Sequence, residues 1–305
     1  MKLKESVDEW LMAKEIENVS VKTMQIYSSM AQEMVDYLGD ISLEDFKAKQ
    51  VREFLGYQMN REGRLGKLSD ATLHKYYSVI RTFCRWLQTQ GYKDIAPTDK
   101  VKAPRVEEKL PETLSDEELE RLWHYLNNHC TFRVRLIFEF FLDTGARLSE
   151  VQRLNVDDVF LNNGWCKLYG KGRREEIIPL GKRLALDMHR YLFDIRPEIV
   201  GDIDEQAFFV TKNGTRYTKS GLSTLVKTKL KRIDVKGSYG PHKLRHTFAT
   251  NFLRYEGGVE QLRRIMRHRS IKTTQRYIAL LPEDLRRAQM EASPLDHLLN
   301  RIGER

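Results

Sequence analysis

The sequence lacks any long apolar run, and it holds only three cysteines in 305 residues. A membrane-spanning helix needs roughly 18 or more consecutive apolar residues, and no segment comes near that length. The first residues, MKLKESVDEW, are polar and contain no apolar signal core, so we expect a cytoplasmic protein. Cys84, Cys130 and Cys166 lie far apart and form no CxxC pair, which excludes a disulfide framework and a cysteine zinc site.

The sequence also has fewer acidic than basic residues. It contains 52 Lys and Arg but only 43 Asp and Glu, which gives a net charge of +9. Residues 1–112 hold 18 basic and 18 acidic side chains, so the whole positive surplus lies in the remainder of the chain. A basic domain favours a polyanionic partner such as nucleic acid, although a basic soluble protein without such a partner has the same composition. The length favours two domains.

Residues 1–95 carry the three-to-four spacing of amphipathic helices, and we expect a small helical bundle. Ser42 and Ser69 have the chemistry of helix N-caps. The helix expected at about 70–90 has an apolar face, and its surroundings are basic. Candidates for contact with a DNA backbone in this region are Arg64, Lys67, Lys75, Arg81 and Arg85. A solvated helix face explains the same pattern equally well.

Residues 96–112 interrupt the helical pattern with three prolines and no periodicity. Proline disfavours helix at its own position and at the preceding residue, so we expect an extended linker. The predicted organisation is a helical domain at 1–95, a linker at 96–112, a second domain at 113–290 and a C-terminal tail at 291–305.

The second domain mixes helices with a small sheet. Ser115 and Glu118 form a capping box, and 134–142 is apolar all round, which is typical of a buried helix. A further helix is expected at 147–154. The period then changes, and a three-stranded antiparallel meander is expected at 159–161, 165–169 and 175–179. Helices resume near 182–193 and 218–231, with a short strand pair near 208–210. The predicted fold class is mainly α with a small antiparallel β-sheet.

Three segments of this domain hold residues suited to chemistry on a phosphate. Arg147 follows a Thr-Gly turn and can grip two phosphate oxygens, or it can simply pair with Glu150. Lys171 lies in a Gly-Lys-Gly turn, where a solvated turn lysine is the ordinary interpretation. His242 and Arg245 project from one face of a helix, but such a pair is common by coincidence.

A fourth segment, MRHRSIKTTQRY at 266–277, adds a histidine, two threonines and a tyrosine. With TGARLSE (144–150), GKG (170–172) and PHKLRHTFAT (241–250), the chain resembles the tyrosine recombinase (lambda-integrase-like) family in motif order and separation. The short helical first domain leans toward the Xer-like subgroup. The resemblance implies a SAM-like core-binding domain followed by an α+β catalytic domain of the DNA breaking-rejoining type.

The resemblance also implies a catalytic set, namely Tyr277, Arg147, Lys171, His242, Arg245 and His268, with Glu150 in support. Tyr277 would attack the scissile phosphate and form a 3′-phosphotyrosyl bond. The two arginines would neutralise the non-bridging oxygens, Lys171 would protonate the departing 5′-oxygen, His242 would assist proton transfer, and His268 would bond the phosphate. No metal or cofactor is expected.

One position departs from the family pattern. Met266-Arg267-His268 stands where the family usually has Leu-Gly-His, and glycine permits a left-handed helix end that arginine does not favour. Either His268 is presented differently, or Arg267 adds a phosphate contact. Lys243 is a further candidate for contact with the DNA backbone.

The expected partners are a double-stranded DNA recombination site and further copies of the chain, forming a tetramer on two sites. The tail carries an apolar stripe, Leu295, Leu298, Leu299 and Ile302, which either packs on its own domain or docks into a neighbouring protomer. A type IB topoisomerase and a catalytically silent DNA-binding regulator are the alternatives.

Overall fold

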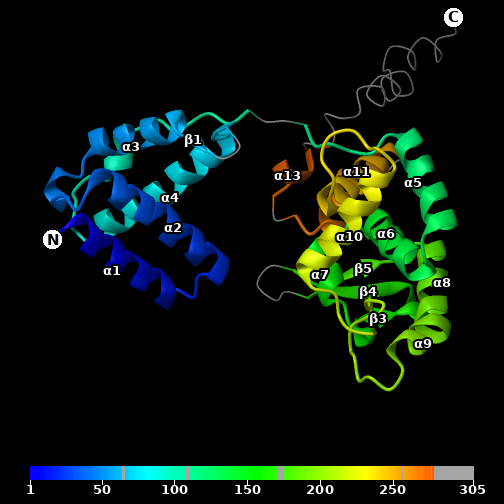
Figure 1. The fold of residues 1–305 in the computed structure, drawn as a ribbon. Helices are drawn as coiled ribbons and strands as arrows, with labels where there is room; N and C mark the ends of the chain where they lie inside the picture. The colour runs from blue at the N-terminus through cyan, green and yellow to red at the C-terminus, as the bar shows by residue number, and fades with distance from the viewer. Residues whose placement is uncertain are drawn as a thin grey trace, which may run out of the picture. The chain divides into compact units, whose positions relative to one another are not determined.

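The computed structural model describes residues 1–63, 66–107, 110–170, 175–255, 257–268, 270–275 and 277. The chain forms two compact units, Met1–Lys109 and Leu110–Arg305, and each is described by itself (Figure 1). Helices predominate, and one small antiparallel sheet accompanies them in the second unit, so the predicted fold class is confirmed. Within the described ranges, no helix has the length and apolarity that crossing a membrane requires.

The first unit is a bundle of four long helices that bury their apolar faces against one another. Ser69 caps the fourth helix, because its hydroxyl accepts a hydrogen bond from the Thr72 amide at 3.3 Å. Trp10, Phe46 and Phe83 are fully or almost fully buried at the centre, and each large apolar side chain contributes about 1.5–3 kcal/mol on burial. The elements are α1 (Leu3–Ile16), α2 (Val21–Leu38), η1 (Leu43–Asp45), α3 (Ala48–Asn60), β1 (Glu62–Gly63), β2 (Gly66–Lys67), α4 (Asp70–Thr89) and η2 (Pro97–Lys100).

The expected helical bundle is confirmed, but two details of this region differ from the prediction. Residues 1–95 are not helical throughout, since β1 and β2 pair as a two-stranded antiparallel hairpin; Gly63 and Gly66 are poor helix formers and interrupt the helix there. Residues 96–112 are not extended throughout either. Pro97–Lys100 form a 3₁₀ turn, and Ala96 and Thr98 are buried against the first unit.

The second unit is built around α6, which is buried along most of its length and packs against α11 (Figure 1). Phe138, Phe140 and Phe141 are fully buried, as the sequence predicts for this helix. Its helices are α5 (Asp116–His129), α6 (Phe132–Thr144), α7 (Leu148–Arg153), η3 (Val156–Asp158), η4 (Leu161–Asn163), α8 (Lys182–Arg190), η5 (Tyr191–Ile195), α9 (Arg196–Val200), α10 (Lys219–Arg232), α11 (Pro241–Arg254), α12 (Val259–Ile265) and α13 (Lys272–Gln275).

The predicted meander is confirmed in strand order and position. The strands are β3 (Val159–Phe160), β4 (Trp165–Tyr169) and β5 (Glu175–Pro179), paired antiparallel in the order β3-β4-β5. Gly164 adopts a left-handed conformation between β3 and β4, which glycine reaches without strain. The strand pair expected near 208–210 is reduced to isolated bridges, one of which joins Val210 to Arg216.

Candidate active site

Arg245 lies on α11 at the centre of the site and is only 4% exposed. Its guanidinium donates to the carbonyls of Gly145 and Met266, the second at 2.6 Å, and to Nε2 of His268 at 3.1 Å. Burial, and then the charges of Arg147 and Arg267, lower the pKa of Arg245 to about 9. The side chain therefore remains a cation at neutral pH, held by neutral acceptors.

Arg147 immediately precedes α7 and binds the carboxylate of Glu150, which lies on that helix. Glu150, 2% exposed, accepts hydrogen bonds from the Arg147 amide at 2.7 Å and from its Nη1 at 2.8 Å. The Arg147 side chain is 35% exposed, so its guanidinium is held by Glu150 and is still open to solvent. The turn before it needs glycine, because Gly145 has φ +56° and an added Cβ would lie 2.3 Å from the ring of Phe248.

His268 packs beside these arginines in a defined tautomer. An arginine N–H can only donate, so Nε2 of His268 is the acceptor. The proton is then on Nδ1, which donates to the Thr274 hydroxyl at 2.8 Å. Neutral His268 in this arrangement already uses its acceptor nitrogen on Arg245.

Tyr277, the last residue that the structure describes, lies in the same site as Arg245 and His268. Its ring is 2% exposed and packs in a small apolar cluster with Phe248 and Met266. Its ring lies 6.4 Å from that of His268, centroid to centroid. The hydroxyl lies 2.8 Å from Nδ1 of His246.

His246 is the residue that the sequence interpretation missed. It follows Arg245 directly, and the motif that singled out His242 and Arg245 gave it no role. The signal was a second histidine one helical turn after His242, and the two rings stack at 6.4 Å. Partial desolvation, and then the charges of Arg245 and Arg147, lower the pKa of His242, so this ring is neutral at pH 7.

The structure thus brings together five of the six predicted catalytic residues, Tyr277, Arg147, His242, Arg245 and His268, along with Glu150. The sixth, Lys171, lies between β4 and β5 and outside the described residues. The tail residues, Leu295 to Ile302, also lie outside them.

Two of the predicted DNA-backbone contacts do not fit their placement. Lys243 is 3% exposed, and its ammonium donates to the carbonyl of Lys236 rather than facing solvent. The Arg267 side chain is 2% exposed and ion-paired to Glu150 at 2.7 Å. Neither cation faces solvent in this structure and each is already bonded within the protein, so neither fits the predicted contact with a DNA backbone.

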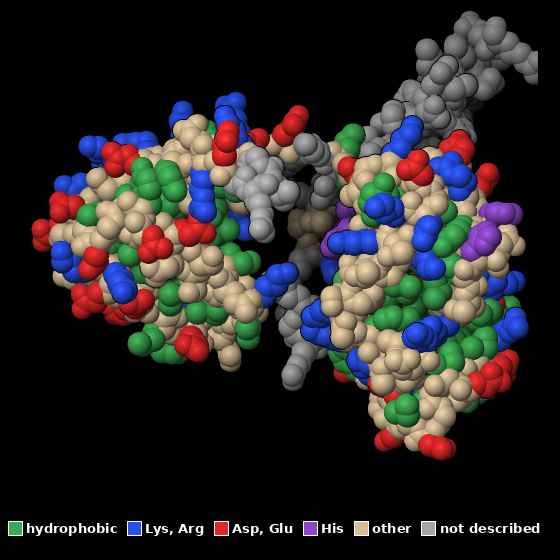
Figure 2. Space-filling model, viewed as in Figure 1, with side chains coloured by type: hydrophobic (Ala, Val, Ile, Leu, Met, Phe, Trp, Pro, Cys, Tyr) green, Lys and Arg blue, Asp and Glu red, His purple; other side chains and the backbone are tan. Residues whose placement is uncertain are grey.

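The remaining candidates are on the first unit. Lys67, Lys75, Arg81 and Arg85 have exposed side chains, and Arg85 pairs with Asp99 at 3.1 Å. Arg64 lies outside the described residues. Figure 2 shows acidic and basic side chains intermixed over the visible face of this unit.

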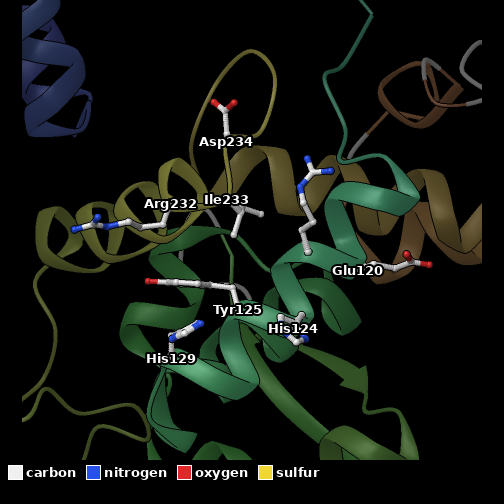
Figure 3. Close-up of a pocket in the computed structure, with 8 residues that line it drawn as sticks. Glu120, His124, Tyr125, His129, Arg232, Ile233 and Asp234 are labelled. Carbon is white, nitrogen blue, oxygen red and sulfur yellow. The ribbon is translucent and has the colours of Figure 1, made fainter.

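A separate pocket of about 730 Å³ opens between α5 and the end of α10 (Figure 3). It is lined by His124, Tyr125 and His129 from α5, by Arg232 at the end of α10 and by Asp234 just beyond α10, and no predicted catalytic residue lines it. Over the described parts of the chain, no three His, Cys, Asp or Glu side chains form a group that could hold a metal ion.

Comparisons with known proteins agree with this architecture. Residues 112–284 match the phage integrase family, and residues 8–103 match the phage integrase SAM-like domain. A tyrosine recombinase XerD of Staphylococcus epidermidis is 29% identical over 294 residues, covering 94% of this chain and 98% of the relative.

Two solved structures share the fold. The crystal structure of the XerH site-specific recombinase bound to a palindromic difH substrate has a TM-score of 0.73 at 21% identity, covering 93% of this chain and 82% of that one. A lambda integrase tetramer bound to a Holliday junction has a TM-score of 0.72 at 17% identity, covering 91% of this chain and 77% of that one. The family match spans more than half of the chain, and the chain therefore belongs to the phage integrase family, as a tyrosine recombinase of the Xer-like subgroup.

Proposed function

We propose that this protein is a site-specific DNA recombinase that cleaves and rejoins DNA through a 3′-phosphotyrosyl bond to Tyr277, without ATP or a metal ion. The observation that carries the proposal is the convergence of Arg147, Arg245, His268 and Tyr277 from segments up to 130 positions apart. A cluster of cations around one phenol suits attack on a phosphodiester and little else.

The arginines supply the electrostatic part of the reaction. Phosphoryl transfer depends chiefly on positioning and on charge stabilisation. Arg147 is open to solvent, so it would bind a non-bridging oxygen of the scissile phosphate directly. Arg245 is buried and rigidly bonded, so its positive charge would stabilise the phosphate from a fixed position.

Proton transfer needs a donor and an acceptor. A phenol with a pKa near 10 is a poor nucleophile at neutral pH, and the Nδ1 atom of His246 lies 2.8 Å from the Tyr277 oxygen. We assign the acceptor role to His246, with His242 stacked behind it. Lys171 would protonate the departing 5′-oxygen, and His268 would bond the phosphate after releasing Arg245.

The phosphotyrosyl bond forms as the tyrosine oxygen attacks phosphorus and the bond from phosphorus to the 5′-oxygen breaks. The energy of the broken ester is retained in the new one, so a second 5′-hydroxyl can reseal the strand without ATP. Because Tyr277 is 2% exposed here, DNA binding must uncover its hydroxyl before attack.

The first unit would also hold the DNA, with Lys67, Lys75, Arg81 and Arg85 as backbone contacts and Arg64 as a fifth. The lambda integrase neighbour is a tetramer on a Holliday junction, which supports assembly of four copies on two sites. The tail stripe, Leu295 to Ile302, is proposed to dock into a neighbouring protomer. We assign residues 1–95 to the clamp, 113–290 to catalysis and 291–305 to this contact.

The test uses a pool of short nicked duplexes of randomised sequence, because a nick lets the cleaved end diffuse away and traps the covalent complex. Protein–DNA adducts are isolated on a denaturing gel, and their DNA is sequenced. We expect wild type to form adducts on a recurrent sequence, and Tyr277→Phe to form none. Adducts that persist in Tyr277→Phe contradict the proposal.

Two alternatives make different predictions in the same experiment. A type IB topoisomerase would form adducts with little sequence preference and relax supercoiled plasmid as a monomer. A silent regulator would enrich a bound sequence but form no adduct.

A further inference from the structure

We propose that Arg267 is a positioning residue, which shares Glu150 with Arg147 so that Arg147 keeps its place and the site keeps a surplus of positive charge for the scissile phosphate. The proposal rests on the proposed function and extends it to a residue that stands where the family usually has glycine.

The backbone at Arg267 has a conformation that an arginine does not favour. Arg267 has φ +56° and follows Met266, the C-cap residue of α12. Its amide donates to the Arg264 carbonyl at 3.0 Å, and the His268 amide donates to the Arg263 carbonyl at 3.0 Å. This is the hydrogen-bond pattern of a Schellman helix end, whose left-handed residue is most often glycine. An arginine persists in such a position only when its side chain gains something that offsets the strain.

The side chain makes that compensating interaction with Glu150. Nη2 of Arg267 lies 2.7 Å from Oε2 of Glu150, and Nη1 donates to the Ile265 carbonyl at 2.8 Å. The two side chains are 2% and 1% exposed, so the pair is shielded from solvent. A charge-assisted bond in such surroundings is strong, and leaving either partner unpaired is unfavourable.

Arg147 is held through this pair and by the backbone of Arg267. Glu150 bonds both the amide and Nη1 of Arg147, and Nη2 of Arg147 donates to the Arg267 carbonyl at 3.3 Å. Removing the Arg267 side chain would leave Glu150 with one guanidinium partner instead of two. Arg147 would then be its sole cation among the described contacts.

The charge balance shows the consequence for DNA. The site holds three guanidiniums, those of Arg147, Arg245 and Arg267, and one carboxylate, which pairs with Arg147 and Arg267, so a surplus of two positive charges remains. With glycine at 267 the surplus is one, and the Glu150 charge is set against Arg147, the arginine that faces solvent. The transition state of phosphoryl transfer is more sensitive to this charge than duplex binding is, because many other contacts share the binding.

The first test compares Arg267→Gly, Arg267→Lys and the control Arg264→Ala. Arg264 pairs only with exposed Glu260 among the described contacts, at the same helix end. The substrate is the nicked duplex that wild type traps most often from the randomised pool. At saturating DNA we expect Arg267→Gly to slow adduct formation about tenfold or more, with little change in DNA affinity. Arg267→Lys should recover much of the rate, and Arg264→Ala should match wild type.

A methylphosphonate at the scissile position separates positioning from a general loss of structure. Its methyl group replaces a non-bridging oxygen and removes the negative charge of the phosphate. The loss of one cation from the site should therefore slow cleavage less on this substrate than on the natural phosphodiester. The rate deficit of Arg267→Gly should therefore shrink on this substrate. An equal deficit on both substrates, or wild-type rates for Arg267→Gly, would overturn the proposal.

An anion probe tests the inference even if no adduct forms. Inorganic sulfate should raise the melting temperature of wild type above that seen in sodium chloride of equal ionic strength. The rise should be smaller for Arg267→Gly and retained in Arg267→Lys and Arg264→Ala. Because glycine suits φ +56°, Arg267→Gly is expected to fold. No adduct in wild type sinks the proposed function, whereas an unchanged sulfate response in Arg267→Gly sinks the role of Arg267.

Discussion

Glu150→Gln should destabilise the second unit more than its conservative chemistry suggests. The carboxylate is 1% exposed on its side chain and accepts three short hydrogen bonds, two from Arg147 and one from Arg267. Glutamine keeps the shape, but it loses the charge and directs an amide N–H₂ toward a guanidinium. Breaking a buried ion pair by removing one partner costs about 3–5 kcal/mol. For a domain of this size, 1 kcal/mol lowers Tm by about 2–4 °C, so a fall of roughly 6–20 °C is expected.

The assay is calorimetry of the full chain, following the transition of the second unit, with Glu260→Gln as the matched control. Glu260 lies three residues before Arg263 and four before Arg264, and it bonds them at 2.7 and 3.1 Å. Its side chain is 48% exposed, so solvent already screens its charge and the transition should not move. Equal melting of Glu150→Gln and wild type would refute the reasoning, and so would an equal loss in both variants.

Two other predictions concern single side chains. His246→Gln should lower the rate of adduct formation at saturating DNA by about tenfold or more. His242→Gln should lower this rate less, because His246 is the ring that contacts the Tyr277 hydroxyl. A larger loss in His242→Gln than in His246→Gln would contradict the assignment. For Glu139, burial and then the neighbouring Asp187 raise the carboxyl pKa from 4.5 to about 7. A raised folded-state pKa means that stability falls as pH rises from about 4.5 through 7, by on the order of 3 kcal/mol. Urea unfolding of the full chain should show this fall in wild type and a smaller one in Glu139→Gln, and an equal fall in both would rule it out.

The sequence was most informative where the signal is local. The Ser115–Glu118 capping box forms as expected, with the two reciprocal bonds at 3.0 and 3.2 Å. The strands at 165–169 and 175–179 begin and end where the pattern predicts. Both features depend on residues within a few positions of one another.

The spacing of apolar residues does not predict contacts between residues that are far apart in the sequence. The partner of Arg267 is Glu150, 117 positions earlier, so nothing near 267 indicated that the guanidinium is buried. His246 meets Tyr277 only because packing brings α11 against a segment 31 residues later. The β1–β2 hairpin has strands of two residues, too short for alternation to be visible.

The central claim is that Tyr277 forms the covalent bond, and the chemistry of the adduct ends tests it most directly. Adducts trapped on nicked DNA would be digested with trypsin, and the peptide on the DNA identified by mass spectrometry. We expect the peptide that contains Tyr277, joined through phosphate to a 3′ end, with a free 5′-hydroxyl that a polynucleotide kinase can label. A bond to another residue, or to a 5′ end, would contradict the account.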